Sequence, residues 1–371
     1  MNSKTISIAG ISLCAIIVGI IGCTTDVKKE KPATIGVYYF DGWAGKNSFD
    51  GDPNEPWAKN APTHLSRRFV EEFGDREPVW GWRDDAQEIM ERQIDLAADN
   101  GVDFFLFCWY WLDDRGPINI DAIEKFSQHA SMEMYLKAKN KERVKFCLLI
   151  ANHQSAEILG DENWEDAVRY WAKYFNDPLY IQVDNKPLVV LFGTGDDAIN
   201  NQQLDKMQEV AKAEGFKDGL AIAGCGGKNV TGKSFTHSTH YNVVPGYAAG
   251  SEEHKFEELI NATKEEWAGA GTEEQPYIPV LSAGWDKRPW EGPTGLGQPE
   301  GWYYPDSSPE LFKGFLEDAI KWMDNNPNKT PKERIVLIYA WNEIGEGGYL
   351  IPTKGDPDAT KLKIIKSVVG Q

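Results

Sequence analysis

Two glutamates, Glu343 and Glu346, lie three positions apart in the segment YAWNEIGEGGYLIPT, residues 339–353. The run RIVLIYA leads into them and has the apolar pattern of a buried strand. Gly345, Gly347 and Gly348 allow a tight turn that points both carboxyl groups into one pocket. Burial and mutual repulsion then push the two pKa values apart, so that one group keeps its proton at neutral pH. Such a pair supplies the acid and the base that hydrolysis of a glycosidic bond requires. The alternative is a solvated loop with ordinary surface glutamates.

The elements that must position this pair follow from the hydrophobic pattern. Short apolar runs predict strands at 35–39, 103–109, 144–151, 186–192, 219–224, 240–244, 276–283 and 334–341. Longer periodic stretches predict helices at 84–101, 121–140, 163–175, 200–214, 252–269, 309–326 and 357–369, and the helix after the fifth strand is weak or missing. This alternation predicts a single α/β domain, a (β/α)8 TIM barrel with parallel strands. A doubly wound open sheet is the alternative.

Two long loops are expected, at 40–83 after the first strand and at 284–308 after the seventh. Loops after barrel strands form the carboxyl-end face, where active sites of this architecture lie. Aromatic faces beside Asp, Asn and His side chains suit the apolar patches and hydroxyl groups of sugars, although any one tryptophan could instead pack a loop. The residues expected to contact substrate are Tyr38, Asp41, Trp109, Trp111, Asn152, His153, Trp285, Asp286, Trp341 and Asn342.

The segment WNEIGEGGYLIPT resembles the WNEWxEG…EP segment of glycoside hydrolase family 99 and of the related WbsX-like proteins. Further matching stretches are VYYFDGW, QIDLAADNGVDFFLFCWYW, LLIANH, YIQVDNKPLVVLF and SAGWDKRPW, so that the resemblance spans about residues 35–353. The chain departs from the motif at Ile344, where the family has a second tryptophan, and at Ile351, where it has an acidic residue.

The resemblance implies a (β/α)8 barrel and retaining cleavage within α-mannoside chains, without a metal ion. Glu343 matches the glutamate proposed to deprotonate the sugar 2-hydroxyl, which then attacks its own anomeric carbon. Glu346 matches the general acid/base that protonates the leaving oxygen and later activates water. Direct attack by a carboxylate uses the same pair and stays open.

We therefore expect a retaining glycosidase that cuts within an α-linked, α-mannoside-like polysaccharide or glycan and uses no cofactor. The alternatives are an α-1,3-glucanase-like hydrolase, a carbohydrate-binding lipoprotein without catalysis, and a WbsX-like glycosyltransferase. No metal site is expected, because the six histidines are scattered and the spacing of His237 and His240 is loose. Sugar, linkage and oligomeric state stay open.

The amino-terminal segment reads as an export signal of a lipoprotein. A short apolar run ends in Gly22-Cys23, which resembles a lipobox, so residues 1–22 are expected to be removed and Cys23 to carry lipid. A plain signal peptide is the alternative. Residues 23–33 form a polar tether and 34–371 the catalytic domain, which predicts an exported protein anchored to a bacterial membrane by its lipid alone. The net charge of −18 argues against a nucleic-acid partner.

Overall fold

The structure is a computed structural model that describes residues 31–112, 116–153, 156–305 and 307–370. The chain from Lys31 onward forms one compact unit. The expected signal segment, the lipidated Cys23 and most of the tether lie outside the described residues. None of the helices in the described part of the chain is long and apolar enough to cross a membrane.

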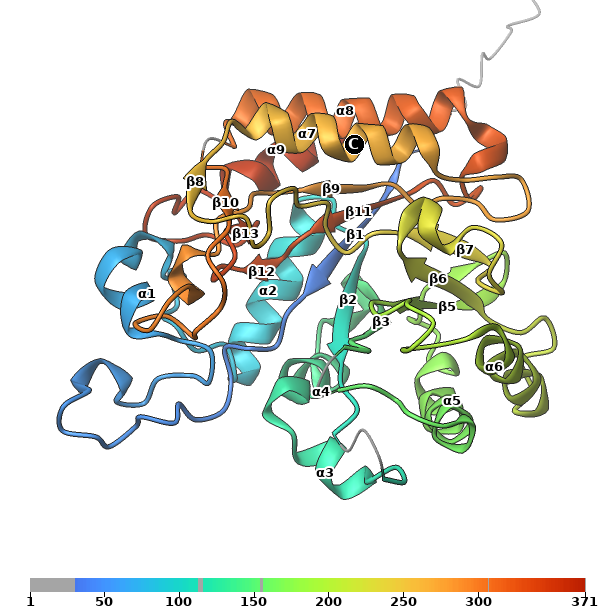
Figure 1. Ribbon diagram of the computed structural model, residues 1–371, viewed down its shortest axis with the longest axis horizontal. Helices are drawn as coiled ribbons and strands as arrows, with labels where there is room; N and C mark the ends of the chain where they lie inside the picture. Colours follow the sequence, from blue (N-terminus) through green and yellow to red (C-terminus); the bar gives the residue numbers. More distant parts are fainter. Residues whose placement is uncertain (1–30, 113–115, 154–155, 306, 371) are drawn as a thin grey trace, which may run out of the picture. The chain divides into compact units, whose positions relative to one another are not determined.

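Eight parallel strands form a nearly closed barrel (Figure 1). They are β1 (Thr34–Tyr39), β2 (Phe104–Trp109), β3 (Lys145–Ile150), β5 (Lys186–Leu191), β6 (Ala221–Cys225), β7 (His237–Thr239), β9 (Val280–Ser282) and β11 (Ile335–Tyr339). Neighbours pair in the order β7-β6-β5-β3-β2-β1-β11-β9. The ring is completed between β7 and β9, where Ser238 N donates to Pro276 O at 3.0 Å and Ile278 N donates to Ser238 O at 2.9 Å. The predicted (β/α)8 barrel is confirmed, and the doubly wound sheet is wrong.

Helices alternate with these strands and lie outside them (Figure 1). They are α1 (Arg67–Glu72), α2 (Gln87–Asp99), α3 (Ile120–Lys125), α4 (Ala130–Lys137), α5 (Asp161–Phe175), α6 (Asn201–Ala213), α7 (Phe256–Gly269), α8 (Pro309–Asn325) and α9 (Thr360–Val369). Each longer helix buries one stripe, as Trp164, Ala167 and Trp171 of α5 illustrate. The chain leaves α2 through Gly101 at φ +84°, a conformation that glycine adopts without strain. After β6 only a short 3-10 turn, Gly227–Val230, replaces a full helix.

The helix expected at 121–140 is broken into α3 and α4. Phe126 adopts an extended conformation between them, and a 3-10 turn, Ser127–His129, follows. This turn brings the buried imidazole of His129 against the chain after β2, where its Nε2 accepts a hydrogen bond from Tyr110 N at 2.9 Å. The hydrogen bond satisfies a buried backbone N–H that an unbroken helix would leave without this acceptor.

The sixth strand was expected at 240–244 and instead spans His237–Thr239. Its residues are polar but buried, because Thr239 Oγ1 donates to Ile278 O at 2.8 Å and the backbone pairs on both sides. The apolar residues that suggested the later position, Val243 and Val244, lie in a loop and pack only partly against the core. Hydrophobicity therefore misplaced a strand whose burial depends on hydrogen bonds.

The two long loops lie against each other at the carboxyl ends of the strands. Trp290 Nε1 donates to His64 O at 3.1 Å, and Ser66 Oγ donates to Pro289 O at 2.6 Å. Short strand pairs stiffen this end of the barrel: β8 (Glu252–Glu253) with β10 (Trp302–Tyr303), and β12 (Asn342–Glu343) with β13 (Gly348–Tyr349). At β5, the short β4 (Gln182–Val183) adds an antiparallel neighbour.

Candidate active site

Glu343 and Glu346 lie where the chain turns back after β11. The antiparallel pair β12–β13 places Glu343 opposite Gly348, and Glu346 N donates to Glu343 O at 3.1 Å inside the turn. Gly347 has φ +79°, and a Cβ atom on Gly348 would lie 2.3 Å from the ring of Tyr339. The glycines around the pair are therefore required by the backbone conformation and by the close approach of Tyr339.

Each of the two carboxyl groups accepts a hydrogen bond from a tyrosine. Tyr241, which follows β7, donates its hydroxyl to Glu343 Oε1 at 2.7 Å, and Tyr339, the last residue of β11, donates to Glu346 Oε2. The rings of the two tyrosines meet edge to face, with centroids 5.0 Å apart. Glu343 is only 4% exposed, and its Oε2 has no hydrogen-bond partner among the described residues.

The surroundings raise the pKa values of both glutamates. Burial, followed by the negative charge of Glu346, raises the pKa of Glu343 well above its usual range, although the bond from Tyr241 opposes the rise. Burial raises the pKa of Glu346 to about 7, against the opposing effects of the Tyr339 hydroxyl and the Lys287 charge. The pair therefore retains a proton near neutral pH, which is the condition for acid and base to work side by side.

Both glutamates line an open cavity of about 860 Å³ at the carboxyl end of the barrel. This volume falls in the range of roughly 300–1,000 Å³ that is typical of small-molecule sites. Aromatic side chains dominate the wall, namely Phe40, Tyr110, Trp111, Phe126, Phe192, Tyr241, Tyr247 and Trp290. Polar side chains interrupt it at a few positions, namely His64, Gln128, His153 and Gln298.

Of the ten residues expected to contact substrate, Trp111 and His153 lie on the cavity wall with the two glutamates. The structure places the other eight behind the wall, and all are buried: Tyr38, Asp41, Trp109, Asn152, Trp285, Asp286, Trp341 and Asn342. Their polar groups mostly bond to the protein itself. Asn342 bridges to Phe40, accepting from its N at 2.8 Å and donating to its O at 2.7 Å. Asp41 accepts from Ser131 N at 2.6 Å and from its Oγ at 2.7 Å.

Two of these buried residues, Trp109 and Trp341, fill the space between the strands and the helices. Trp341 Nε1 donates to Gln93 Oε1 of α2 at 2.7 Å. Trp109 faces α5, where its ring lies 5.2 Å from that of Trp171. Because side chains alternate along a strand, the residues on either side of Trp109, Cys108 and Tyr110, face the cavity instead.

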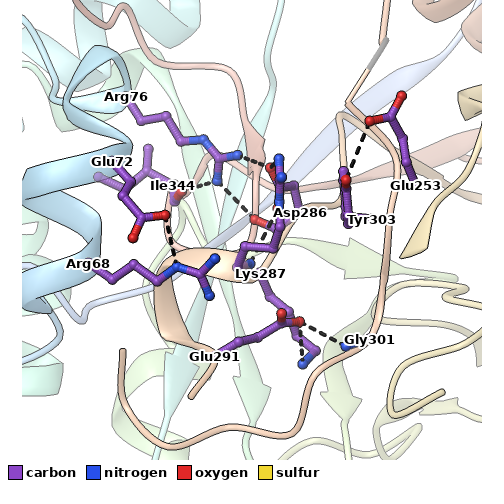
Figure 2. A network of polar contacts seen from close by, with 11 residues as sticks. Arg68, Glu72, Arg76, Glu253, Asp286, Lys287, Glu291, Gly301, Tyr303 and Ile344 are labelled. Atoms are coloured by element: carbon purple, nitrogen blue, oxygen red, sulfur yellow. Dashed lines mark hydrogen bonds and ion pairs between the residues drawn. The ribbon is translucent and has the colours of Figure 1, made fainter. Parts of the chain in front are cut away.

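Asp286 joins the two long loops through its contacts with Arg76 (Figure 2). Its carboxylate forms ion pairs with Arg76 and with Arg288, the latter at 2.8 Å. Arg76 Nη1 also donates to Asp286 O at 2.9 Å and to Ile344 O at 3.3 Å, and Asp286 N donates to Glu346 O at 2.6 Å. Asp286 therefore holds the backbone on which Glu346 sits, and it lies outside the cavity lining.

A second ion pair closes the loop after β9 on itself (Figure 2). Lys287 Nζ lies 3.0 Å from Glu291 Oε1, and both side chains are almost fully buried. Glu291 Oε1 also accepts from Gly301 N at 3.0 Å, which ties the two ends of the segment 287–301 together. This closed segment carries Trp290 and Gln298 to the cavity wall.

The two tyrosines that bond the glutamates were missed by sequence analysis. Tyr339 lies inside the apolar run before the pair, and Tyr241 lies inside the misplaced sixth strand. Only their position at strand ends distinguishes them from ordinary core tyrosines.

In the ranges that the structure describes, no three or more His, Cys, Asp or Glu side chains are grouped so as to hold a metal ion. The two histidines of the HSTH segment have separate partners. His237 Nδ1 lies 2.8 Å from Thr236 Oγ1, and His240 Nδ1 lies 2.9 Å from Tyr277 Oη.

The model of the family described as Glycosyltransferase WbsX matches residues 82–360. The chain belongs to this WbsX family. It is 21% identical over 368 residues to the uncharacterized protein WxcX of Xanthomonas campestris pv. campestris (strain B100), a match that covers 89% of the chain and 48% of the relative. The chain thus spans about half the length of that curated relative.

Solved structures of other proteins share the barrel architecture of this chain. The chain is similar to the GH99 endo-alpha-mannosidase from Bacteroides thetaiotaomicron in complex with Bis-Tris propane, with a TM-score of 0.59 and 15% identity, covering 90% of this chain and 95% of that one. A structure titled glycoside hydrolase-like protein matches with a TM-score of 0.58 and 14% identity, covering 92% and 94% of the two chains. The resemblance to both families is confirmed, and this WbsX-family chain shares the barrel fold of these two solved structures.

Proposed function

We propose that this WbsX-family chain is a retaining glycoside hydrolase that cuts within an α-linked, α-mannoside-like polysaccharide or glycan. One observation carries the proposal: Glu343 and Glu346 share the wall of a large, aromatic-lined cavity, and each is held by its own tyrosine. The fold shared with an endo-alpha-mannosidase supports the same chemistry.

In the proposed reaction, Glu346 gives its proton to the leaving oxygen while Glu343 removes the proton from the sugar 2-hydroxyl. The 2-oxygen then attacks the anomeric carbon of its own ring, and the glycosidic bond breaks. Water next attacks the anomeric carbon and gives a proton to Glu346. The bond between that carbon and the 2-oxygen breaks, and Glu343 returns its proton to the 2-oxygen. The side chain of Glu343 lines the cavity, which supports its role as the base.

Direct attack by one carboxylate on the anomeric carbon is the second route for the same pair. Both routes need one protonated and one ionised carboxyl group in the free protein. The raised pKa values of Glu343 and Glu346 keep a proton on the pair near neutral pH.

The test is hydrolysis of a panel of α-linked polysaccharides that includes α-mannan and α-1,3-glucan, with product lengths measured by chromatography. We expect oligosaccharides of mixed length from α-mannan, as internal cleavage produces. Glu343→Gln and Glu346→Gln should each lower turnover by about 10²- to 10⁴-fold. The matched control is Glu300→Gln, an exposed glutamate in the loop that carries Trp290, and it should leave turnover unchanged.

A substrate with a good leaving group separates the two roles. Such a substrate needs little protonation, so an aryl α-mannobioside should restore much of the rate of Glu346→Gln but not that of Glu343→Gln. If both variants hydrolyse the identified polysaccharide at nearly the wild-type rate, the catalytic groups lie elsewhere.

The family name raises transfer to a sugar as the second candidate. The same pair would serve it if a sugar hydroxyl, in place of water, attacked the anomeric carbon. Incubation with α-manno-oligosaccharides distinguishes the two, because hydrolysis gives only shorter chains and transfer also gives longer ones. Consumption of a nucleotide-sugar donor, with no cleavage of any polysaccharide, would replace the hydrolase proposal by a glycosyltransferase.

A further inference from the structure

A second, smaller hollow lies beside the active-site cavity, between the two long loops. Its volume is about 210 Å³, and its walls come from the loop after β1 and from the residues after Trp290. This volume is below the roughly 300–1,000 Å³ of sites for drug-sized ligands, and it suits a single sugar ring.

The two hollows share a dividing wall made of two segments. In the first segment, His64 lines the cavity that holds the glutamates, and its neighbours Thr63 and Leu65 line the second hollow. In the other segment, Gln298 lines the cavity and Leu296 lines the second hollow. The second hollow therefore lies directly behind the part of the cavity wall that His64 and Gln298 form.

Two aromatic side chains border the second hollow. Phe49 is 51% exposed, which is unusual for so large an apolar side chain, and Trp57 is half-buried. Their ring centroids lie 6.1 Å apart. Trp57 Nε1 donates to Glu55, whose carboxylate accepts two hydrogen bonds from Arg67, at 2.5 and 3.0 Å. These bonds fix the indole in place without any ligand.

The charges around the hollow are paired. Arg67 neutralises Glu55, and Lys46 lies 3.3 Å from Asp50 next to Phe49. The hollow thus combines an exposed aromatic surface with hydrogen-bonding groups and no charge excess. These are the properties that suit a neutral, hydroxyl-rich ligand with one apolar face, and they disfavour a charged ligand.

We infer that this hollow is a secondary binding site for a further sugar of the same polysaccharide that occupies the active-site cavity, an inference that rests on the proposed function. The apolar face of the sugar packs on Phe49 and Trp57. Its hydroxyl groups meet Arg67, Glu55 and Thr63 at the rim. The site would hold a long chain across the dividing wall, and it would contribute nothing to a substrate too short to reach it.

The experiment compares a long and a short substrate in the full-length chain. Phe49→Ala should raise the KM for α-mannan roughly 3- to 10-fold, the loss expected for one aromatic contact, with kcat nearly unchanged. The kcat/KM for an aryl α-mannobioside, which is confined to the cavity, should stay at the wild-type value. Phe49→Trp keeps an aromatic surface and should preserve the wild-type KM. The matched control is Ile120→Ala, which removes an exposed apolar side chain on α3. It should leave kcat/KM unchanged for both substrates.

A binding measurement separates failure of this inference from failure of the proposed function. Glu346→Gln should be retarded by α-mannan in an affinity gel, and Phe49→Ala added to it should weaken the retardation. Retardation that depends on Phe49 without hydrolysis by the wild type would overturn the proposed function alone. The secondary site would be overturned if Phe49→Ala lowered kcat/KM equally on α-mannan and on the aryl α-mannobioside, or lowered it on neither. It would also be overturned if α-mannan did not retard Glu346→Gln. A change in oligomeric state of Phe49→Ala by light scattering would overturn it as well, because the hollow would then bind a second copy of the chain.

Discussion

Replacing Tyr339 by phenylalanine should show which of the two glutamates acts as the acid. The substitution removes the hydroxyl that donates to Glu346 Oε2 and leaves the ring in place. A hydrogen bond to a charged group contributes about 1.5–3 kcal/mol, and one pKa unit corresponds to about 1.4 kcal/mol. The pKa of Glu346, which is about 7 in the native chain, should therefore rise by about 1 to 2 units.

The assay is the pH dependence of kcat/KM on the polysaccharide that the panel identifies. If Glu346 is the acid, the active form carries its proton, and a higher pKa keeps that form populated at higher pH. On the alkaline side of the profile kcat/KM should then rise by about 10- to 100-fold, and the acid side should not change. If Glu346 must be ionised instead, kcat/KM on the acid side should fall by that factor and the alkaline side should stay constant.

Tyr241→Phe is the complementary variant, because Tyr241 donates to Glu343 Oε1 at 2.7 Å. It should lower kcat/KM on the acid side only, if Glu343 is the base. Tyr247→Phe is the control, since Tyr247 lines the same cavity but bonds neither carboxylate in the described part of the chain. Profiles that keep their shape in both Tyr339→Phe and Tyr241→Phe would refute the assignment of the two tyrosines to the two glutamates.

Three further predictions concern stability, positioning and anchoring. The folded pKa of Glu346 lies above the value of 4.5 for a free glutamate, so the folded chain binds this proton more tightly than the unfolded chain. Its stability should therefore fall by about 3 kcal/mol as pH rises from about 4.5 to 7, and Glu346→Gln should flatten that slope of the melting temperature. Arg76→Met removes the donor to the carbonyls of Ile344 and Asp286, and kcat should fall at least about tenfold with a smaller change in KM, measured in steady-state kinetics. Cys23→Ala should release the chain from membranes or leave its signal uncut, as palmitate labelling and membrane partition would show.

The barrel could be predicted because most of its strands are buried on both faces. Runs such as FFLFCW in β2 and IVLIY in β11 are apolar at every position, and apolarity alone marks them. The strand β7 has the sequence HST and is buried through hydrogen bonds, so its position could not be read from hydrophobicity. The interruption at Phe126 escaped prediction for a similar reason, because it depends on the distant contact of His129 with Tyr110.

The candidate site was predictable only in part. The glutamate pair could be found because the two residues immediately follow a strong strand signal. It was harder to predict which side chains point into the cavity, because neighbouring residues of a strand point to opposite sides. Trp109 faces α5, whereas the adjacent Cys108 and Tyr110 face the cavity. Asp286 looked like a ligand-binding residue, but its partner Arg76 lies 210 positions away and no local pattern announces the pair.

The closure of the barrel affects the pKa of Glu343. Tyr241 follows β7, whereas Glu343 follows β11, and β9 lies between these strands. The distance from the Tyr241 hydroxyl to Glu343 therefore depends on the seam between β7 and β9. The backbone bonds of this seam involve Ser238, and the side chain of Thr239 adds a hydrogen bond to Ile278 O. Any loosening of the seam would move Tyr241 away from Glu343 and raise the pKa of that glutamate further, because burial would then act without the opposing hydrogen bond. The polar residues of β7, which look ill suited to a barrel strand, are thus the ones that hold the Tyr241 hydroxyl at Glu343 and limit the rise of its pKa.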